Sequence, residues 1–522
     1  MATPPIPTVE ITVQDQGGGA ALSVPLSTVQ LKVGVAIGAT PNVPLATSSP
    51  TYLQANLGDG CGPLVEAAGL VCETGNIVVA MAIPVVTPGT ATAVQATIPN
   101  GSTSTITTTL DSTYGAYDSY FVEMTVVKAG TIGTAPGPTV QFSGDAGRTL
   151  GPPISLGAAN SYYLGSGVLN TPAPGGTGIQ VNFGAGALAV GDTWRFATTA
   201  AAGNVSGIQA ALAAFQASQY GVAGVGSIHI VGDTMHGGST DTDIAGIQTQ
   251  LQAGVAIYEF QRAIVELRDV KTPAAWGGSG ETEATWIAAL QTAVSGLDAQ
   301  PRICADGGNY NMQSAYSNAS FGTPEYRRSL AWAHAVIRTQ IKLEQRAGRI
   351  RNANQPYSQI DVNPASDPGD GFVYHDERTT PGLAAARISC AMTWPKKGAG
   401  FFHCTEPLLC APGSQQAELG IGNVLDAACD IAYAEGIESV SDDLLTQPNG
   451  TLDPIALNLL QGDIQEALNQ GLTAPSYVSA VTATVNPTAD VEETGVIPVT
   501  VAVQQKAYVN ALQETVLLSG GG

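Results

Sequence analysis

The sequence is poor in charge, and basic residues are its scarcest charged class. Charged side chains make up 12% of the 522 residues, about half of the ~25% typical of soluble proteins. Lys and Arg number 20 against 42 Asp and Glu, so the net charge at pH 7 is −22. Such a chain would be repelled by nucleic acid and by anionic membrane surfaces, so neither is an expected partner. A surface with so little charge also indicates extensive burial by protein partners.

Long hydrophobic runs are scarce as well. The longest apolar run covers residues 77–86 and contains Pro84, which is too short a stretch to cross a bilayer. The first residues, MATPPI, have neither the basic nor the apolar part of a secretory signal. We therefore expect a protein that is made in a cytoplasm and stays soluble there.

The chain has few features of an enzyme. It contains no Gly-x-Ser-x-Gly elbow, and Gly-rich runs such as residues 58–62 match neither the dinucleotide-binding nor the phosphate-binding pattern. His375, Asp376 and Glu377 are consecutive, and consecutive residues do not converge on one point as a catalytic triad does. We interpret them as a polar cluster or salt-bridge hub, and the sequence predicts no catalytic residue and no cofactor.

Seven cysteines are present, an odd number that leaves at least one thiol free or paired between chains. His403, Cys404 and Cys410 lack the spacing of a zinc site, so packing or a disulfide is the favoured interpretation and no metal site is predicted. Small buried side chains are the first expectation for all seven, and oxidation after release from a cell is the alternative. The candidates for such disulfides are Cys61, Cys72, Cys304, Cys390, Cys404, Cys410 and Cys429.

What the chain has in abundance is Gly (62) and Pro (32), and the patterns change along its length. Residues 29–86 suggest strand, helix and strand. Residues 93–203 contain short strands separated by Gly turns, typical of a β-sandwich. Residues 204–376 alternate strands with helices, including a long helix over 324–347, as in a wound sheet. The fold class predicted is a multidomain α+β and α/β protein.

Both chain ends carry strand candidates next to Gly-rich segments. Residues 8–15 alternate, with Val9, Ile11 and Val13 on one face, and residues 17–19 form a Gly joint. Residues 509–517 are a weaker strand candidate, marked by Val509, Ala511 and Leu517. A terminal strand on a flexible joint is able to pair outside its own domain.

Two sets of charged residues are predicted to attract neighbouring subunits. A basic stripe recurs on one face of the predicted helix, and acidic residues follow later in the chain; surfaces of opposite sign can drive head-to-tail polymerisation. The basic residues are Arg338, Lys342, Arg346 and Arg349, extended by Arg327, Arg328 and Arg351. The acidic contact surface consists of Glu418, Asp426, Asp430 and Glu435.

An ordered set of motifs resembles the contractile tail sheath family of phages and related injection systems. The motifs are residues 58–68 (GDGCGPLVEAA), 191–199 (GDTWRFATT), 325–333 (EYRRSLAWA), 375–383 (HDERTTPGL), 398–402 (GAGFF), 423–432 (NVLDAACDIA) and the β unit 481–484 with 499–503. The resemblance spans most of the chain. It implies a homopolymer of stacked hexameric rings around a tail tube, in which terminal arms complete the sheets of neighbours. Contraction would then drive the tube through the host envelope without nucleotide.

The resemblance also implies a domain plan and partners. We expect an N-terminal arm (1–20), a discontinuous core assembly domain (21–92 with 377–505), an inserted β-rich protruding domain (93–203), an α/β domain (204–376) and a C-terminal arm (506–522). The expected partners are copies of the chain itself, the tail tube protein, which helices near 417–470 would contact, and baseplate and terminator proteins. The expected location is a virion tail, after synthesis in a host bacterial cytoplasm. A β-rich surface-array or adhesion protein and a hydrolase using His375 and Asp376 are the alternatives.

Overall fold

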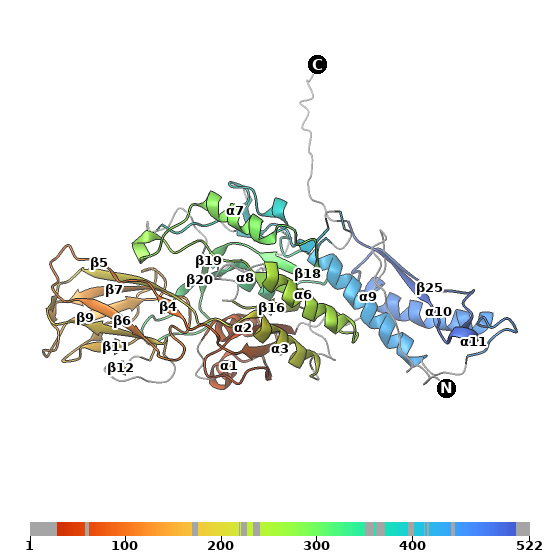
Figure 1. Cartoon of the computed structure of the whole chain (residues 1–522), viewed down its shortest axis with the longest axis horizontal. Helices are drawn as coiled ribbons and strands as arrows, with labels where there is room; N and C mark the ends of the chain where they lie inside the picture. The colour runs from red at the N-terminus through yellow and green to blue at the C-terminus, as the bar shows by residue number, and fades with distance from the viewer. Residues whose placement is uncertain are drawn as a thin grey trace, which may run out of the picture. The chain divides into compact units, whose positions relative to one another are not determined.

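The computed structural model describes residues 29–57, 62–166, 168–169, 176–218, 220, 227–232, 241–349, 360–361, 371–394, 401–411, 413–414, 417–439 and 444–507. The chain divides into two compact units, one of residues 26–423 and one of residues 1–25 with 424–522, and each is described by itself (Figure 1). The predicted N-terminal arm and residues 508–522 of the predicted C-terminal arm lie outside the described residues, with Val9, Ile11, Val13, Val509, Ala511 and Leu517, as do Cys61 and Arg351.

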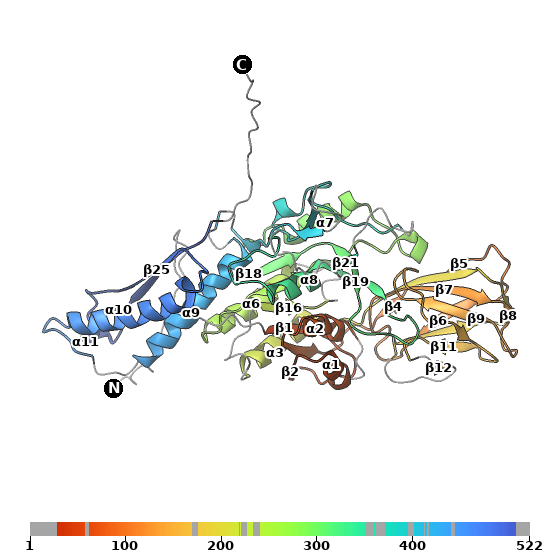
Figure 2. The same cartoon turned by 180° about the vertical axis from the view of Figure 1, so that it is seen from behind.

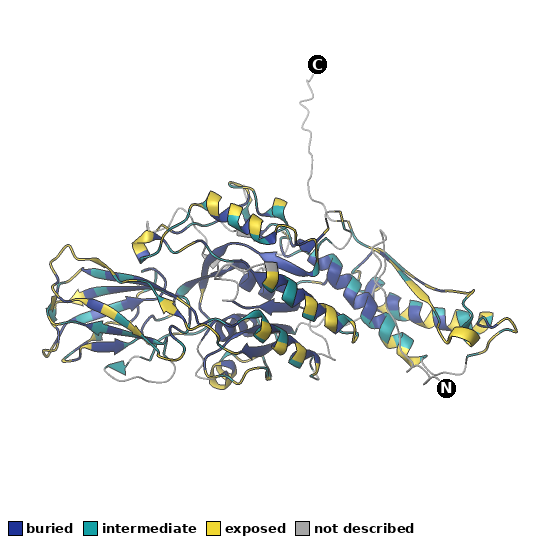
Figure 3. Ribbon diagram, viewed as in Figure 1, coloured by how far each residue is buried: buried dark blue, intermediate teal, exposed yellow. Residues whose placement is uncertain are grey.

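The larger unit contains a seven-stranded sheet with a parallel centre. Its strands, in spatial order, are β2 (Pro44–Thr47), β3 (Val78–Ile83), β1 (Gln30–Val35), β16 (Ser227–Ile230), β17 (Ala263–Glu266), β18 (Ala299–Asp306) and β24 (Leu408–Cys410). The edge strands β2 and β24 run antiparallel to their neighbours. The strands β1, β3, β16 and β17 are buried along their whole length, as expected of a sheet covered on both faces (Figure 3).

Alternate residues of β3 belong to two different cores. Val79, Met81 and Ile83 pack with the helices α3 (Val205–Gln216), α6 (Asp241–Val255) and α7 (Glu283–Val294). Val78 and Ala80 pack with α1 (Pro50–Asn56), α2 (Pro63–Glu73) and α8 (Leu330–Arg338). The two-residue period of a strand therefore explains why helices are needed on both faces.

A β-sandwich occupies the β-rich part of the same unit. One antiparallel sheet consists of β10 (Ile154–Ser155), β9 (Thr139–Ser143), β7 (Phe121–Lys128), β15 (Thr193–Thr199), β4 (Thr90–Ala91) and β5 (Gln95–Thr97); the other consists of β12 (Val168–Leu169), β11 (Ser161–Tyr163), β13 (Ile179–Phe183) and β6 (Ile106–Leu110). Their facing side chains form one core, in which the rings of Phe142 and Tyr162 stack 5.4 Å apart.

Smaller sheets complete this unit. They pair β8 (Gly130–Thr131) with β14 (Ala187–Leu188), β19 (Asn309–Gln313) with β20 (Glu325–Ser329) and β21 (Ile360–Asp361), and β22 (Ala391–Thr393) with β23 (Phe401–His403). The helix α9 (Leu419–Glu438) begins in this unit and continues into the other. None of the helices in the described ranges is long and apolar enough to cross a membrane.

The domain boundaries stay a prediction; β1, in the predicted core domain, pairs directly with β16, in the predicted α/β domain. One detail differs from the sequence-based predictions. The single helix predicted over 324–347 is wrong: residues 325–329 are strand β20, and α8 ends at Arg338. Pairing of β20 with β19 outweighs the helical pattern, and Ser329 caps α8 by accepting from Ala331 N.

The smaller unit contains most of α9, then α10 (Pro454–Leu468), α11 (Val491–Thr494) and the two-stranded ribbon of β25 (Ala480–Val485) and β26 (Val499–Gln504) (Figure 2). Pro454 opens α10, and the Asp453 carboxylate accepts from Ile455 N at 2.8 Å. The ribbon packs on α10 through Ala483 and Val485, which are buried.

Candidate assembly surface

The ribbon of the smaller unit has one satisfied edge and one open edge. On the outer edge of β25, Ala483 N donates to Gln465 Oε1 at 2.8 Å and Val485 N donates to Gln461 Oε1 at 3.2 Å, both from α10. Glutamine side chains therefore occupy the positions that a third strand would take on this side.

The outer edge of β26 has no such cover among the described residues. Just outside the strands, Asn486 N donates to Pro498 O, which identifies the even-numbered pairs as the hydrogen-bonded ones. In an antiparallel pair these alternate with residues whose backbone groups point outward. The N–H and C=O groups of Val499, Val501 and Val503 thus face away from β25, and the sheet has two strands in the described part of the chain. An open edge of this kind is a template for another strand.

The helix α10 is apolar on two sides. Leu460, Ile464 and Leu468 are buried against the rest of the unit. Ile455 and Leu459, four residues apart and therefore neighbours on one helix face, are 69% and 63% exposed. Further exposed apolar side chains of this unit are Ile437, Leu445 and Val496 (Figure 3). Exposed apolar side chains concentrated in one small unit are typical of a protein-binding surface.

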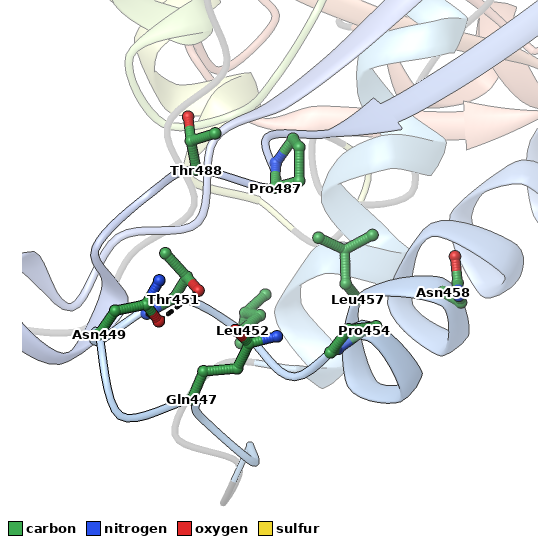
Figure 4. A pocket seen from close by; sticks show the side chains of 9 residues that line it. All are labelled: Gln447, Asn449, Thr451, Leu452, Pro454, Leu457, Asn458, Pro487 and Thr488. Atoms are coloured by element: carbon green, nitrogen blue, oxygen red, sulfur yellow. Dashed lines mark hydrogen bonds between the residues drawn. The ribbon is translucent and has the colours of Figure 1, made fainter.

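A hollow of about 480 Å³ lies in the same unit, between the start of α10 and the turn after β25 (Figure 4). Its lining residues are Gln447, Asn449, Thr451, Leu452, Pro454, Leu457, Asn458, Pro487 and Thr488. Thr451 Oγ1 donates to Asn449 Oδ1 at 2.9 Å. None of these nine side chains is ionisable, so the hollow offers no acid or base to activate the hydroxyl groups of Thr451 and Thr488.

The residues of the predicted basic stripe do not share a helix face, because α8 ends at Arg338. Arg338 is buried, donates to Leu343 O and Gln345 O, and lies 3.5 Å from Glu406 Oε1. Arg327 forms a two-pronged ion pair with Asp269 at 2.6 and 2.8 Å. These guanidinium groups are used inside the chain, and a contact role for Lys342 and Arg349 stays a prediction.

The predicted acidic surface is likewise divided. Glu418 pairs with Arg346 of the same chain, Oε1 to Nη2 at 2.8 Å, so these two residues join parts of one subunit. Asp426 is buried, whereas Asp430 and Glu435 are partly exposed on α9. Burial raises the pKa of Glu435, helped by the nearby Glu438 and Asp463. A role of Asp430 and Glu435 between subunits stays a prediction.

Two chains of buried ionisable groups lie in the larger unit, and the first runs across β1, β16 and β17 of the seven-stranded sheet. In the first, Lys32 Nζ lies 2.7 Å from His229 Nδ1, and His229 Nε2 lies 2.9 Å from Glu266 Oε1, which also accepts from Trp332 Nε1. Burial lowers the pKa of Lys32 to about 7 despite the opposing charge of Glu266.

In the second chain, His334 bridges Asp306 and Glu406, with 2.8 Å on each side. Burial alone would lower the pKa of His334, but the two carboxylates raise it to about 9. Every one of these side chains is buried, and none lines the hollow beside α10 or the hollow around Tyr316. These contacts connect α8, through Trp332 and His334, to strands β17 and β18.

Six of the cysteines lie in the described ranges. Cys72, Cys304, Cys390 and Cys404 carry free thiols, and Cys410 and Cys429 are buried. Burial raises the pKa of Cys304 well above its ordinary value, which makes that thiol unreactive. Oxidation between chains stays a prediction.

A cluster of buried polar side chains in the larger unit brings His375 and Glu377 together with Cys390, which follows 13 residues after Glu377. His375 Nε2 lies 2.9 Å from Glu377 Oε2, and its Nδ1 lies 2.9 Å from Glu283 Oε1. The Cys390 thiol joins them, because the ligand atoms of His375, Glu377 and Cys390 lie within 4.8 Å of one another, and Cys404 N donates to Cys390 O at 2.6 Å. This cluster was not predicted from the sequence, although residues two apart, such as His375 and Glu377, share a face in extended chain.

Asp376 points elsewhere: its carboxylate accepts from Thr393 N and from Thr393 Oγ1. The hydrolase alternative required a pocket lined by His375 and Asp376; neither residue lines the hollow beside α10 or the hollow around Tyr316.

No family model and no curated protein matches this chain. Among solved structures, it is similar to the sheath tail protein of Desulfitobacterium hafniense (12% identity, 92% of each chain, TM-score 0.42) and to a sheath tail protein of Listeria innocua (8%, 93% of each chain, 0.44). It is also similar to the helical sheath of the anti-feeding prophage in its contracted state (11%, 99% of each chain, 0.43). All three are sheath proteins, as the sequence motifs led us to expect.

Proposed function

We propose that this chain is the subunit of a contractile tail sheath, which polymerises through its own end strands and acts mechanically. The observation that carries the proposal is the open edge of β26, formed by the outward backbone groups of Val499, Val501 and Val503. A strand from a neighbouring copy would satisfy these groups and extend the ribbon to three strands.

The segment of residues 8–15 fits this edge by its composition. Its Val9, Ile11 and Val13 alternate with polar residues, so one face would continue the apolar side of the ribbon, where Ala483 and Val485 are buried. Each added backbone hydrogen bond contributes a net ~0.5–1.5 kcal/mol. The Gly joint at residues 17–19 lets the donor subunit change its orientation while the strand stays paired.

The exposed apolar face of α10 supplies a second contact. Ile455 and Leu459 would be covered by a neighbouring subunit or by the tail tube protein, in keeping with a tube-facing role of the helices within 417–470. Stacked hexameric rings around a tube, with baseplate and terminator proteins at the ends, form the assembly that this function requires. Contraction would be driven by new subunit contacts, with the strand links intact.

The test replaces Val501 by proline. This change removes an outward N–H while leaving the even-numbered pairs to β25 in place, so Val501→Pro should give folded subunits that fail to form striated tubes in electron micrographs. Val501→Ala keeps the N–H and is the matched control, which should assemble. Deletion of residues 1–16 should have the same effect as the proline. Normal tubes from both the proline variant and the deletion would refute strand exchange, and flat arrays from the wild type would favour a surface-layer protein.

A further inference from the structure

The His375–Cys390 cluster of the larger unit has the composition and arrangement of a metal site. The ligand atoms of His375, Glu377 and Cys390 lie within 4.8 Å of one another, and all three residues are buried. Cys404 stands opposite Cys390 on the hairpin of β22 and β23 and adds a fourth candidate, although its thiol is not one of the ligand atoms within 4.8 Å of one another. Two thiolates, an imidazole and a carboxylate are ligands that suit Zn²⁺.

The backbone brings the two thiols together. In the hairpin of β22 and β23, Ala391 pairs with His403, so the next residues outward, Cys390 and Cys404, face each other. Cys404 N donates to Cys390 O at 2.6 Å. Side chains of directly opposed residues start from Cβ atoms about 4.5–5.5 Å apart, a spacing from which two sulfurs can reach one ion.

The outer surroundings already orient the ligands. The Nδ1 atom of His375 is held by the Glu283 carboxylate at 2.9 Å, the arrangement in which a carboxylate fixes the tautomer and orientation of a zinc-binding imidazole. Glu377 is fixed by the backbone N–H groups of Gly382, Leu383 and Ala384 at 2.9–3.1 Å. This leaves Nε2 of His375 and Oε2 of Glu377 directed at each other, 2.9 Å apart.

The distances require little movement. Tetrahedral zinc ligands, at roughly 2.0–2.3 Å from the ion, are separated from one another by about 3.3–3.8 Å. The His375–Glu377 pair must open slightly, and the Cys390 sulfur must approach from within the 4.8 Å limit of the cluster. Cys404, opposite Cys390 on the hairpin, must turn its thiol toward the same point. Cys404 is only partly buried, which gives an ion a route from solvent.

We propose that His375, Glu377, Cys390 and Cys404 bind one structural Zn²⁺ ion. The ion would join the segment of residues 371–377 to the hairpin of β22 and β23. Four protein ligands close the coordination sphere, as in structural rather than catalytic zinc sites. On binding, the ion takes the place of the thiol protons, which are released to solvent. The inference is independent of the proposed function.

The decisive experiment measures zinc in the full-length protein, expressed with zinc and then dialysed. We expect about one ion per chain, retained in Cys72→Ala, a control at a buried cysteine of α2, and lost in Cys404→Ser and His375→Gln. Chelation should lower the thermal unfolding temperature of the wild type and leave that of Cys404→Ser unchanged. Absence of zinc from the folded wild type would overturn the proposal. So would zinc that persists in Cys404→Ser but is lost in Cys304→Ala, since it would place the ion at the other cluster, Cys304, Asp306 and His334.

Two measurements on the wild type guard against variants that fail to fold. Co²⁺ added to the metal-free protein should give the sulfur-to-cobalt charge-transfer absorption of a thiolate site, and Zn²⁺ should protect Cys404 from alkylation. A Cys390–Cys404 disulfide found by peptide mapping without reductant would show that these cysteines are oxidised and bind no metal ion, which would overturn the proposal.

Discussion

Arg328 and Asp118 are 210 residues apart in the sequence, yet Nη2 of the arginine donates to Oδ2 of the aspartate at 2.8 Å. The same nitrogen lies 3.2 Å from Glu66 Oε2, and the guanidinium stacks over the Trp332 ring. Asp118 comes just before the sandwich strand β7, and Glu66 lies in α2. The arginine therefore links the sandwich to a helix of the α/β sheet through a buried ion pair.

Replacing Arg328 by alanine leaves these two acidic groups without their buried cation. We expect a loss of about 3–5 kcal/mol in the free energy of unfolding, measured by urea denaturation, since breaking a buried pair strands a charge. The matched control is Arg195→Ala, whose partner Glu123 is also in the sandwich but whose side chain is 35% exposed. It should cost about 0–1 kcal/mol. Equal decreases in the free energy of unfolding of the two variants would show that the buried ion pairs of Arg328 stabilise the fold no more than the exposed pair of Arg195.

A charge exchange tests whether Arg346 and Glu418 act within one subunit. Arg346→Glu and Glu418→Arg should each lower the free energy of unfolding by roughly 1.5–3 kcal/mol, because each places like charges against one another at the site of the 2.8 Å contact. The double variant should recover most of that loss in monomer unfolding. If the single variants instead unfold like the wild type but fail to polymerise, the pair belongs to a contact between subunits.

The buried Lys32 predicts a dependence of stability on pH. Its pKa falls from 10.5 to about 7 on folding, so between these values the unfolded chain holds a proton that the folded chain does not. Stability from this group is complete above pH 10.5 and is lost as pH falls through 7. As the pH rises from 7 to 10, the free energy of unfolding of the wild type should therefore increase relative to that of Lys32→Met, by up to about 1.4 kcal/mol per pH unit. Urea unfolding of both proteins at several pH values measures the difference, and a flat difference would contradict the buried neutral amine.

A substitution on the exposed apolar face of α10 should prevent polymerisation without destabilising the folded monomer. Leu459→Asp should leave monomer unfolding within about 0.5 kcal/mol of the wild type, as expected for an exposed position, while sedimentation shows a loss of polymer. The neighbouring Leu460→Ala is the contrast: Leu460 is buried, so its truncation should cost about 2–5 kcal/mol. Full assembly by Leu459→Asp would remove this face from the contact surface.

Local patterns gave much of the secondary structure correctly. The alternation of strands and helices predicted over 204–376 is found in α3, β16, α6, β17, α7 and β18, and the short strands predicted within 93–203 include β7. Periodicity and capping, as at Asn204, whose side chain accepts from Gly207 N, act over a few residues and are legible in the sequence. The exception, β20, shows a tertiary strand pairing overriding a helical pattern.

The sequence by itself determined the acidic, charge-poor composition, the β-rich inserted region and the alternating strands of the chain, because these depend on residue type and short-range spacing. Only the tertiary structure decided that Arg338 is used inside the chain, that Arg346 meets Glu418, and that His375 and Glu377 meet Cys390. Such meetings depend on which strands pair. β1, for example, lies beside β16 across 197 residues, and apolar strands of similar composition do not specify their neighbours without the packed core around them.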